Sequence, residues 1–327
     1  MSSTLSAAQQ KYEDAARAGW LYYVAGKTQD EIARQLHTSR QSAQRLVALA
    51  VSEGLIKVRL QHPVKRCMEL ASQLKEVFGL QQCEVVPSDA DNPHSTAGLA
   101  QAGAAELERY LKGQHPRTVA LGTGRILRAC ADELTALQCP QHNIVSLVGN
   151  IAHDGSASRY DVAVHVAERA GARHFPMPLP VIAPSEEDKQ QWHNLPHVSN
   201  VRALALKADV AFVGIGHLGT VSPLHIDGFI AKDTLDNLET AGAAGEMISW
   251  IFDGQGQLID SPINRCVTSM SLQDLAGTTI IGIAAGEEKI AAINGALKSG
   301  LLNGLITNEY TAARLLESSS QQSQSAE

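Results

Sequence analysis

The sequence of 327 residues has little cysteine and proline and no long apolar run, and each shortage excludes a class of protein. Its 12 prolines and 26 glycines are too few for a fibrous or wholly disordered chain. Its five cysteines are odd in number and never spaced as a metal-binding pair, so we expect free thiols and a reducing cytoplasm. No apolar run approaches the roughly 20 residues that cross a bilayer, and the polar start does not resemble a secretion signal. We therefore expect a cytoplasmic protein without a membrane partner.

The composition is that of a globular protein with unevenly distributed charge. Hydrophobic residues make up 44% and charged residues 19%, which is enough for a core, and the length exceeds the roughly 100 to 200 residues of one domain. Residues 1–66 hold ten Lys or Arg and five Asp or Glu, whereas residues 67–327 hold 17 and 29. A basic head on an acidic body indicates two parts with different partners, and the basic part favours local contact with nucleic acid.

The basic head is predicted to contain three helices. Tyr12–Val24 has apolar residues at helical spacing and is followed by a glycine that can end a helix. Thr28 and Glu31 form a capping-box pattern that starts a short second helix, and Ser39 can cap a third. Residues 55–60 then alternate apolar and basic side chains, which predicts a short exposed strand, or wing. This order is typical of a winged helix-turn-helix.

The outer face of the third predicted helix carries arginine and glutamine side chains that suit base recognition. Arginine matches guanine O6 and N7, and glutamine offers both a donor and an acceptor to adenine. The alternative is an ordinary three-helix subdomain whose polar face is only solvated. The net charge and the wing favour DNA binding. The residues expected to contact DNA are Thr28, Gln29, Ser39, Arg40, Gln41, Gln44, Arg45, Lys57 and Arg59.

After residue 62 the sequence alternates between predicted strands and helices. The candidate strands are 84–86, 118–121, 144–148, 210–215, 279–283 and 305–307, and the helical stretches between them are 98–111, 126–137, 163–170, 289–298 and 310–316. Short apolar runs separated by helices predict a parallel sheet buried on both faces, so we expect a doubly wound α/β fold. The expected boundaries are 1–61 for the winged helix-turn-helix, 62–80 for a connecting helix, 81–317 for the α/β domain and 318–327 for a disordered polar tail.

The turn Gly122-Thr123-Gly124-Arg125 lies between a predicted strand and a predicted helix. Backbone amides at such a helix start can bind an anion, and the threonine hydroxyl and the guanidinium add further donors, so a phosphate fits. The alternative is a tight turn that needs glycine only for its backbone. The turn lacks the third glycine of a dinucleotide fingerprint and the pattern of a nucleotide-binding loop, so we expect neither NAD nor ATP.

The head and the body also carry motifs of a known family. The segments that carry these motifs are Trp20-Leu21-Tyr22-Tyr23, residues 26–33, residues 39–46, Leu121–Arg125, Val210–Gly216, residues 245–253 and Ile283–Lys289. In this order they resemble the SorC family of bacterial sugar-responsive transcriptional regulators over about residues 12–317. The resemblance implies a winged helix-turn-helix joined to an effector domain whose fold is similar to sugar-phosphate isomerases.

The same resemblance implies roles for residues of the effector domain. Asp253 is expected to accept hydrogen bonds from sugar hydroxyls, and Lys289 is expected to neutralise the ligand's anionic group. Asn150 follows Gly149 where family members commonly have paired glycines, and this departure leaves the identity of the ligand open. The residues expected to bind the effector are Gly122, Thr123, Gly124, Arg125, Gly149, Asn150, Gly216, Asp253 and Lys289.

These observations together predict a cytoplasmic DNA-binding regulator, expected to repress a carbohydrate or polyol operon under the control of a sugar or polyol phosphate. The alternative is an isomerase-like enzyme that acts on sugar phosphates, since a fold alone does not exclude catalysis. The histidines lack zinc-site spacing, so we expect no metal and no cofactor. The expected partners are double-stranded operator DNA, the effector and further copies of the chain, in a dimer or a tetramer.

Overall fold

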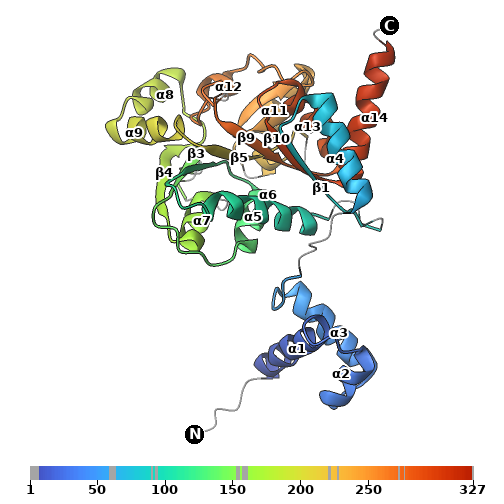
Figure 1. The fold of residues 1–327 in the computed structure, drawn as a ribbon. Coiled ribbons are helices and arrows are strands. Elements are labelled where there is room, and N and C mark those ends of the chain that lie inside the picture. Colours follow the sequence, from blue (N-terminus) through green and yellow to red (C-terminus); the bar gives the residue numbers. More distant parts are fainter. Residues whose placement is uncertain are drawn as a thin grey trace. The chain divides into compact units, whose positions relative to one another are not determined.

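The computed structural model divides the chain into two compact units, Met1–Pro63 and Val64–Glu327, and each is described by itself (Figure 1). The structure describes residues 7–58, 64–89, 91–92, 95–151, 155–156, 161–219, 222–226, 228–271, 273–275 and 277–325. We call the first unit the head and the second the body.

The head is built from the three predicted helices, α1 (Ala7–Tyr23), α2 (Gln29–Gln35) and α3 (Arg40–Ser52). The capping box is present, because the Glu31 amide donates to Thr28 Oγ1 and the Thr28 amide donates to Glu31 Oε2. Ser39 caps α3 by accepting a hydrogen bond from the Ser42 amide. The small core of the head consists of Ala18, Leu21, Ile32, Ala33, Ala43 and Val47. The apolar spacing of the sequence therefore predicted this core well.

The predicted wing is not a strand in the part of the head that the structure describes. Leu55–Val58 form turns and irregular backbone, and Arg59 and Leu60 lie outside the described residues. The Ile56 amide instead donates to the Ala50 carbonyl, and Ile56 packs near Gly19, where a side chain would collide with Ala50. A strand needs a hydrogen-bonding partner, and the described head offers none.

The body contains a seven-stranded parallel sheet with the strand order β1-β10-β9-β5-β2-β3-β4, which confirms the predicted doubly wound α/β fold. Its strands are β1 (Gln82–Val86), β2 (Thr118–Leu121), β3 (Asn143–Ile151), β4 (Arg173–Pro180), β5 (Val210–Gly214), β9 (Thr279–Ile283) and β10 (Gly304–Asn308). The edge strand β4 is the one that the sequence did not predict. It contains three prolines, which cannot donate to a sheet and are tolerated at its edge.

Helices cover both faces of the sheet (Figure 1). One layer consists of α5 (Ala97–Leu111), α6 (Arg125–Glu133) and α7 (Val162–Ala170), and the other of α4 (Lys65–Phe78), α9 (Pro196–Ala205), α13 (Ile290–Lys298) and α14 (Glu309–Ser325). Each layer packs against its own apolar cluster of buried strand and helix residues. The sheet strands are therefore buried on both sides, as their continuous apolar runs require.

Smaller elements follow β4 and β5 in the chain. A three-stranded antiparallel sheet is formed by β6 (Gly216–His217), β7 (Ala243–Met247) and β8 (Trp250–Asp253). The remaining helices are α8 (Glu186–His193), α10 (Pro223–Ile226), α11 (Lys232–Thr240), α12 (Pro262–Cys266) and the 3₁₀ turn η1 (Glu287–Lys289). The sequence predicted none of these except the last residue of η1, Lys289, where the predicted helix 289–298 begins.

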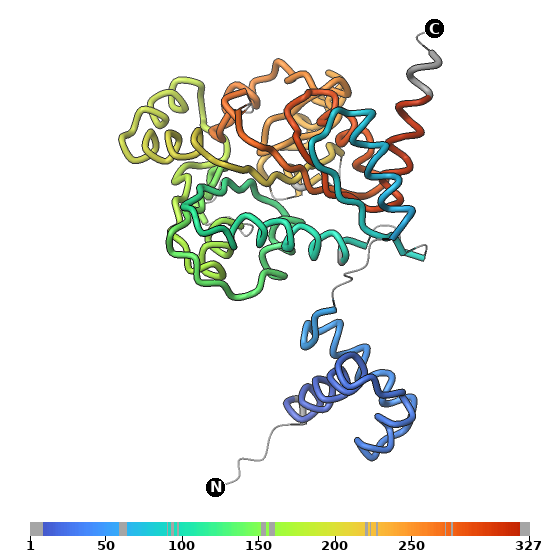
Figure 2. Tube along the Cα trace, in the orientation of Figure 1, coloured from blue at the N-terminus to red at the C-terminus, as the bar shows by residue number. Residues whose placement is uncertain are grey.

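The helix expected to connect the two parts belongs to the body. Leu70 and Leu74 of α4 are buried in the same apolar cluster as Val85 of β1 and Leu305 of β10. Figure 2 shows α4 running beside α14, with which it packs. The body therefore begins before α4.

The tail expected to be disordered from residue 318 is helical as far as Ser325. Leu315 of α14 is fully buried and anchors the helix. The hydroxyls of Ser318, Ser319 and Ser320 each donate to the carbonyl four residues earlier, so these polar side chains bond within the helix. Extending an anchored helix costs less than starting one, which explains why a polar segment continues it.

Candidate effector pocket and DNA-binding face

A cavity of about 340 Å³ lies at the carboxyl ends of the strands in the middle of the body sheet. It is lined by Thr96, Thr123, Gly124, Arg125, Ile126, Val148, Gly149, Val181, Gly214, Ile215, Gly216, His217, Leu224, Phe229, Glu246, Ser249, Ala285, Glu288 and Lys289. From β2 the chain continues to β3 and β4 at one edge of the sheet and then returns to β5, which lies on the other side of β2. The cavity therefore lies where the strand order reverses. Open α/β sheets bind their ligands at this position.

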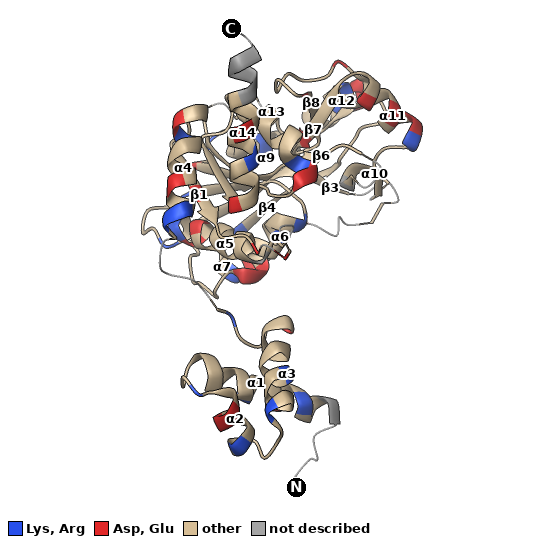
Figure 3. Ribbon diagram, turned by 90° about the vertical axis from the view of Figure 1, so that its right-hand side faces the viewer, with Lys and Arg blue, Asp and Glu red and all other residues tan. Residues whose placement is uncertain are grey.

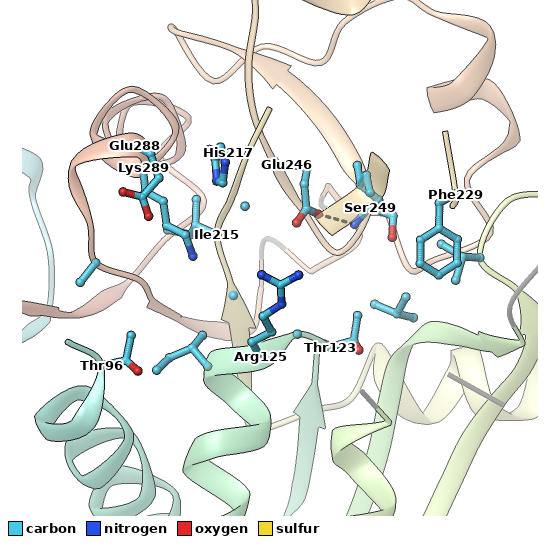
Figure 4. A pocket seen from close by; sticks show the side chains of 18 of the residues that line it. Thr96, Thr123, Arg125, Ile215, His217, Phe229, Glu246, Ser249, Glu288 and Lys289 are labelled. Atoms are coloured by element: carbon cyan, nitrogen blue, oxygen red, sulfur yellow. Dashed lines mark hydrogen bonds between the residues drawn. The ribbon is translucent and has the colours of Figure 1, made fainter. Parts of the chain in front are cut away.

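One side of the cavity is suited to an anion. Gly124, with φ of 123°, precedes α6, and no side chain caps the first amides of that helix. Arg125 begins α6, and Lys289 reaches the same cavity from η1, beyond β9 (Figure 4). Two cationic side chains from distant segments and a helix start thus converge on one space, which favours a negatively charged ligand group.

Burial and neighbouring charges shift the pKa values of three titratable groups in the cavity. Burial lowers the pKa of the Lys289 ammonium and Arg125 acts in the same direction, whereas Glu288 and Glu246 oppose them. Burial raises the pKa of the Glu246 carboxyl, against the hydrogen bond from Ser249 and the charge of Lys289. Burial also lowers the pKa of His217, and both of its ring nitrogens lack a hydrogen-bond partner among the described residues. Such perturbed groups gathered in one cavity are typical of a functional site.

Glu246 is held in place by its own hairpin. Its Oε2 accepts a hydrogen bond of 2.9 Å from the Ser249 amide. The two-residue turn between β7 and β8 consists of Ile248 and Ser249, with φ of 44° and 72°. Such turns normally contain Asn-Gly or similar pairs, because left-handed backbone is costly for a branched side chain. The strained turn therefore aims the Ser249 amide at the carboxylate that faces the cavity.

The structure brings together six of the nine residues predicted to bind the effector: Thr123, Gly124, Arg125, Gly149, Gly216 and Lys289. The other three do not line the cavity. Gly122 lies beneath it, with its amide bonded to the Phe212 carbonyl. Asn150 donates to Asp161 over 3.4 Å. The carboxylate of Asp253 accepts hydrogen bonds from the amides of residues 255 and 257, so it closes the turn after β8.

Two acidic residues line the cavity, Glu246 and Glu288, and the sequence analysis assigned neither of them to the effector site. One signal was present, because Glu246 is a lone acid next to the apolar run from Met247 to Phe252. The apolar lining residues Phe229 and Leu224 carried no signal, since a single apolar side chain in a short segment without regular apolar spacing has no local pattern. Asp253 thus lies outside the lining of the cavity, and Glu246 is a further candidate for the acceptor role that was expected of Asp253.

The predicted DNA-binding side chains lie on the exposed face of α3. Arg40, Gln41, Gln44 and Arg45 are all exposed, and Arg40 lies 3.7 Å from Asp30 of α2 in a surface ion pair. The hydroxyls of the caps at Thr28 and Ser39 already bond within the head. Figure 3 shows Lys and Arg on α2 and α3. Gln29 is half-buried at the start of α2, Lys57 is exposed, and Arg59 lies outside the described residues.

Metal-binding groups and membrane-spanning helices are considered only for the part of the chain that the structure describes. No group of three or more His, Cys, Asp or Glu side chains there could hold a metal ion. No helix there is long and apolar enough to cross a membrane.

Comparison with known proteins identifies the family. The sequence pattern of the sugar-binding domain family (Sugar-bind) matches residues 62–317, which is most of the chain. The chain is a member of the SorC family of sugar-responsive transcriptional regulators. The predicted resemblance is thereby confirmed.

Relatives of this SorC-family protein are named as regulators, and the match covers nearly the whole length of each. The erythritol catabolism regulatory protein EryD of Brucella abortus is 31% identical over 302 residues, 92% of this chain and 96% of that protein. The transcriptional regulator LsrR of Escherichia coli K12 is 30% identical over 311 residues, 94% of this chain and 95% of that one. The predicted function, transcriptional regulation, is confirmed by this family membership.

Solved structures support the same assignment. The full-length sorbitol operon regulator SorC of Klebsiella pneumoniae is 26% identical, with a TM-score of 0.69, and the match covers 94% of this chain and 99% of that one. A regulator of the DeoR family from Listeria monocytogenes has the same TM-score at 22% identity over 76% of this chain, and shows the fold alone.

A substitution at Gly216, which lines the cavity, tests whether Glu246 contacts the ligand. A Cβ at Gly216 would overlap Oε1 of Glu246, the flexible end of a side chain, so Gly216→Ala should displace the carboxylate and leave the fold intact. We expect the affinity for a polyol phosphate to fall about tenfold, the worth of one charge-assisted hydrogen bond. Calorimetry of the full chain measures it. Gly254→Ala is the control, because a Cβ there meets nothing within 4 Å. Equal affinities for both variants would mean that Glu246 does not contact the ligand.

Proposed function

We propose that this protein represses a carbohydrate or polyol catabolic operon by binding its operator through the head, and that a phosphorylated sugar or polyol in the body cavity controls this binding. The observation that carries the proposal is the convergence of Arg125, Lys289 and Glu246 on one cavity at the strand ends. The relatives named as regulators of erythritol catabolism and of a sorbitol operon support the class of ligand.

The cavity has complementary groups for both parts of such an effector. Arg125, the amides at the start of α6 and Lys289 suit a phosphate, which accepts hydrogen bonds and carries negative charge. Glu246, held by Ser249, suits hydroxyl donors when ionised. A neutral polyol would use only the second group, so we expect phosphorylated ligands to bind more tightly.

The head supports the other half of the proposal. Its α3 presents two arginines and two glutamines on one exposed face, with Ser39 capping the end that would approach a base pair. A single head buries little surface on DNA, and helix-turn-helix proteins commonly bind paired half-sites as symmetric dimers. We therefore propose that the chain works as a homo-oligomer, a dimer or a tetramer, in the cytoplasm.

The alternative, an isomerase-like enzyme, receives less support. Family members are named as regulators, and a basic head is unnecessary for catalysis on a small molecule. Glu246 and Lys289 do line the cavity together, so the alternative can be tested directly. We propose that the protein is not an enzyme, and we expect no turnover of the sugar phosphates that it binds, as followed by nuclear magnetic resonance.

Substitutions on the head test the DNA half of the proposal. Replacing Gln44 or Arg45 with Ala should cost about 1–3 kcal/mol at the operator and relax base preference, because base-edge contacts would be lost. Lys57→Ala should instead weaken binding to all sequences alike and lower the salt slope by about one. Fluorescence anisotropy on operator and scrambled duplexes at several salt concentrations separates the two effects.

The control for this experiment is Lys11→Ala, on the exposed side of α1 rather than on α3. It should change neither base preference nor operator affinity by a comparable amount. If the Gln44 and Arg45 variants keep the specificity of the parent chain, α3 is not the recognition helix.

A further inference from the structure

The cavity of the body is chemically divided into two ends. In Figure 4, Lys289, Glu288 and His217 lie together on one side, Phe229 lies on the opposite side, and Arg125 and Glu246 lie between them. The charged end is the one assigned above to the anionic group of the effector.

The end near Phe229 is lined by apolar side chains from three segments. Val148 of β3 and Val181 after β4 come from the edge of the sheet away from β9 and Lys289, and Leu224 of α10 belongs to a cluster against which Phe229 packs; these three are between 2% and 7% exposed. Phe229 packs against two apolar clusters, one that contains Val148 and Val181 and one that contains Leu224. These four side chains have no group that could bond a hydroxyl.

Two polar groups beside this end bond to the protein. The Val181 carbonyl accepts hydrogen bonds from the amide and the hydroxyl of Thr268. The ring of His225, next to Leu224, bonds to the Ile230 carbonyl over 3.1 Å. A ligand hydroxyl placed against these four apolar side chains would lose its water and gain no hydrogen bond from them, which is unfavourable.

We propose that the effector is asymmetric, with its anionic group between Arg125 and Lys289, and that the opposite end carries no hydroxyl and places a methyl or methylene group against Val148, Val181, Leu224 and Phe229. This inference rests on the proposed function of the cavity and makes it narrower, because it separates deoxy from fully hydroxylated sugar phosphates. The cavity volume of about 340 Å³ is at the small end of the range for ligand sites, which agrees with a short carbon chain.

Two available five-carbon compounds provide the test. 1-Deoxy-D-xylulose 5-phosphate and D-xylulose 5-phosphate differ only in the hydroxyl at the end remote from the phosphate. We expect calorimetry on the full chain to show about tenfold tighter binding of the deoxy compound, since an apolar pocket discriminates against an added hydroxyl by roughly this factor or more. Equal or reversed affinities would overturn the inference.

Variants of the apolar wall show whether that wall is the cause. Val181→Thr has nearly the same shape and adds a hydroxyl, so it should bring the two affinities close together; Phe229→Tyr serves the same purpose at a half-buried position if the first variant fails to fold. Val166→Thr is the matched control, because Val166 is fully buried on α7 and does not line the cavity. A preference that persists unchanged in both wall variants would also overturn the inference.

The same experiment distinguishes this inference from the proposed function. If neither xylulose compound binds but erythritol 4-phosphate, ribitol 5-phosphate or sorbitol 6-phosphate does, the apolar-end inference fails and the proposed function survives. If none of the five binds, the proposed phosphorylated effector fails as well.

Discussion

Lys289→Ala is expected to lower the affinity for a phosphorylated polyol more than a hundredfold. Lys289 and Arg125 are the described cationic side chains that line the cavity, and they approach it from different segments. A charge-assisted contact to a phosphate contributes up to about 3 kcal/mol, which corresponds to a factor of about 150 in Kd. Calorimetry with erythritol 4-phosphate and with free erythritol measures the loss for each ligand. The free polyol should be nearly unaffected, because it offers no anion to the ammonium.

Two controls accompany this variant. Lys232→Ala removes an exposed lysine at the start of α11 that does not line the cavity, and it should leave both affinities unchanged. Thr123→Val removes a hydroxyl beside the start of α6 and should lower the affinity for the phosphate by a smaller factor. Tighter binding of the free polyol than of its phosphate, unchanged by either cavity variant, would show that the turn at 122–125 is only structural.

Cutting the chain between residues 63 and 64 is expected to lower the head's operator affinity by a factor of about 10² to 10⁴. The head holds its own small core, and the body holds two larger ones, so each part should fold. If the body carries the oligomer interface, a severed head loses the effective concentration that links two half-sites. The body fragment should keep its effector binding and have no DNA affinity. Anisotropy and calorimetry on both fragments measure this.

A head fused to a dimeric coiled coil is the control for this cut. It should regain most of the operator affinity, which would show that the loss came from separation of the half-sites and not from damage to the head. If the severed head binds the operator as tightly as the whole chain does, the proposal that the body joins the heads in an oligomer is wrong. If the body fragment binds the operator, the assignment of DNA binding to the head is wrong.

Much of the fold could be predicted from local patterns. The apolar runs at β2, β5 and β9 were recognisable because strands buried on both faces exclude polar residues. β4 was missed because its prolines argue against a strand unless its place at the sheet edge is known. The hairpin of β7 and β8 was missed because Ile248-Ser249 is not a sequence that normally adopts its left-handed turn.

Several residues predicted for the site line the cavity. The turn at 122–125 was recognisable because its glycines lie between a predicted strand and a predicted helix, whereas Lys289 was expected from the family resemblance. Asp253 was expected from the family resemblance, and Glu246 was not considered because the sequence does not show where the hairpin turns. The structure turns the chain at Ile248, so Glu246 faces the cavity and Asp253 closes a loop.

The sequence by itself determined the division into a basic head and an acidic body, the capped helices of the head, the parallel sheet and the glycine turn at 122–125. These depend on charge, apolar spacing and caps, all of which act over a few residues. Only the tertiary structure placed Glu246 in the same cavity as Lys289 and Arg125, and Phe229, Leu224 and Val181 in its lining. The physical reason is that these residues come from strand ends and loops far apart in the chain, and packing of the whole body places them together.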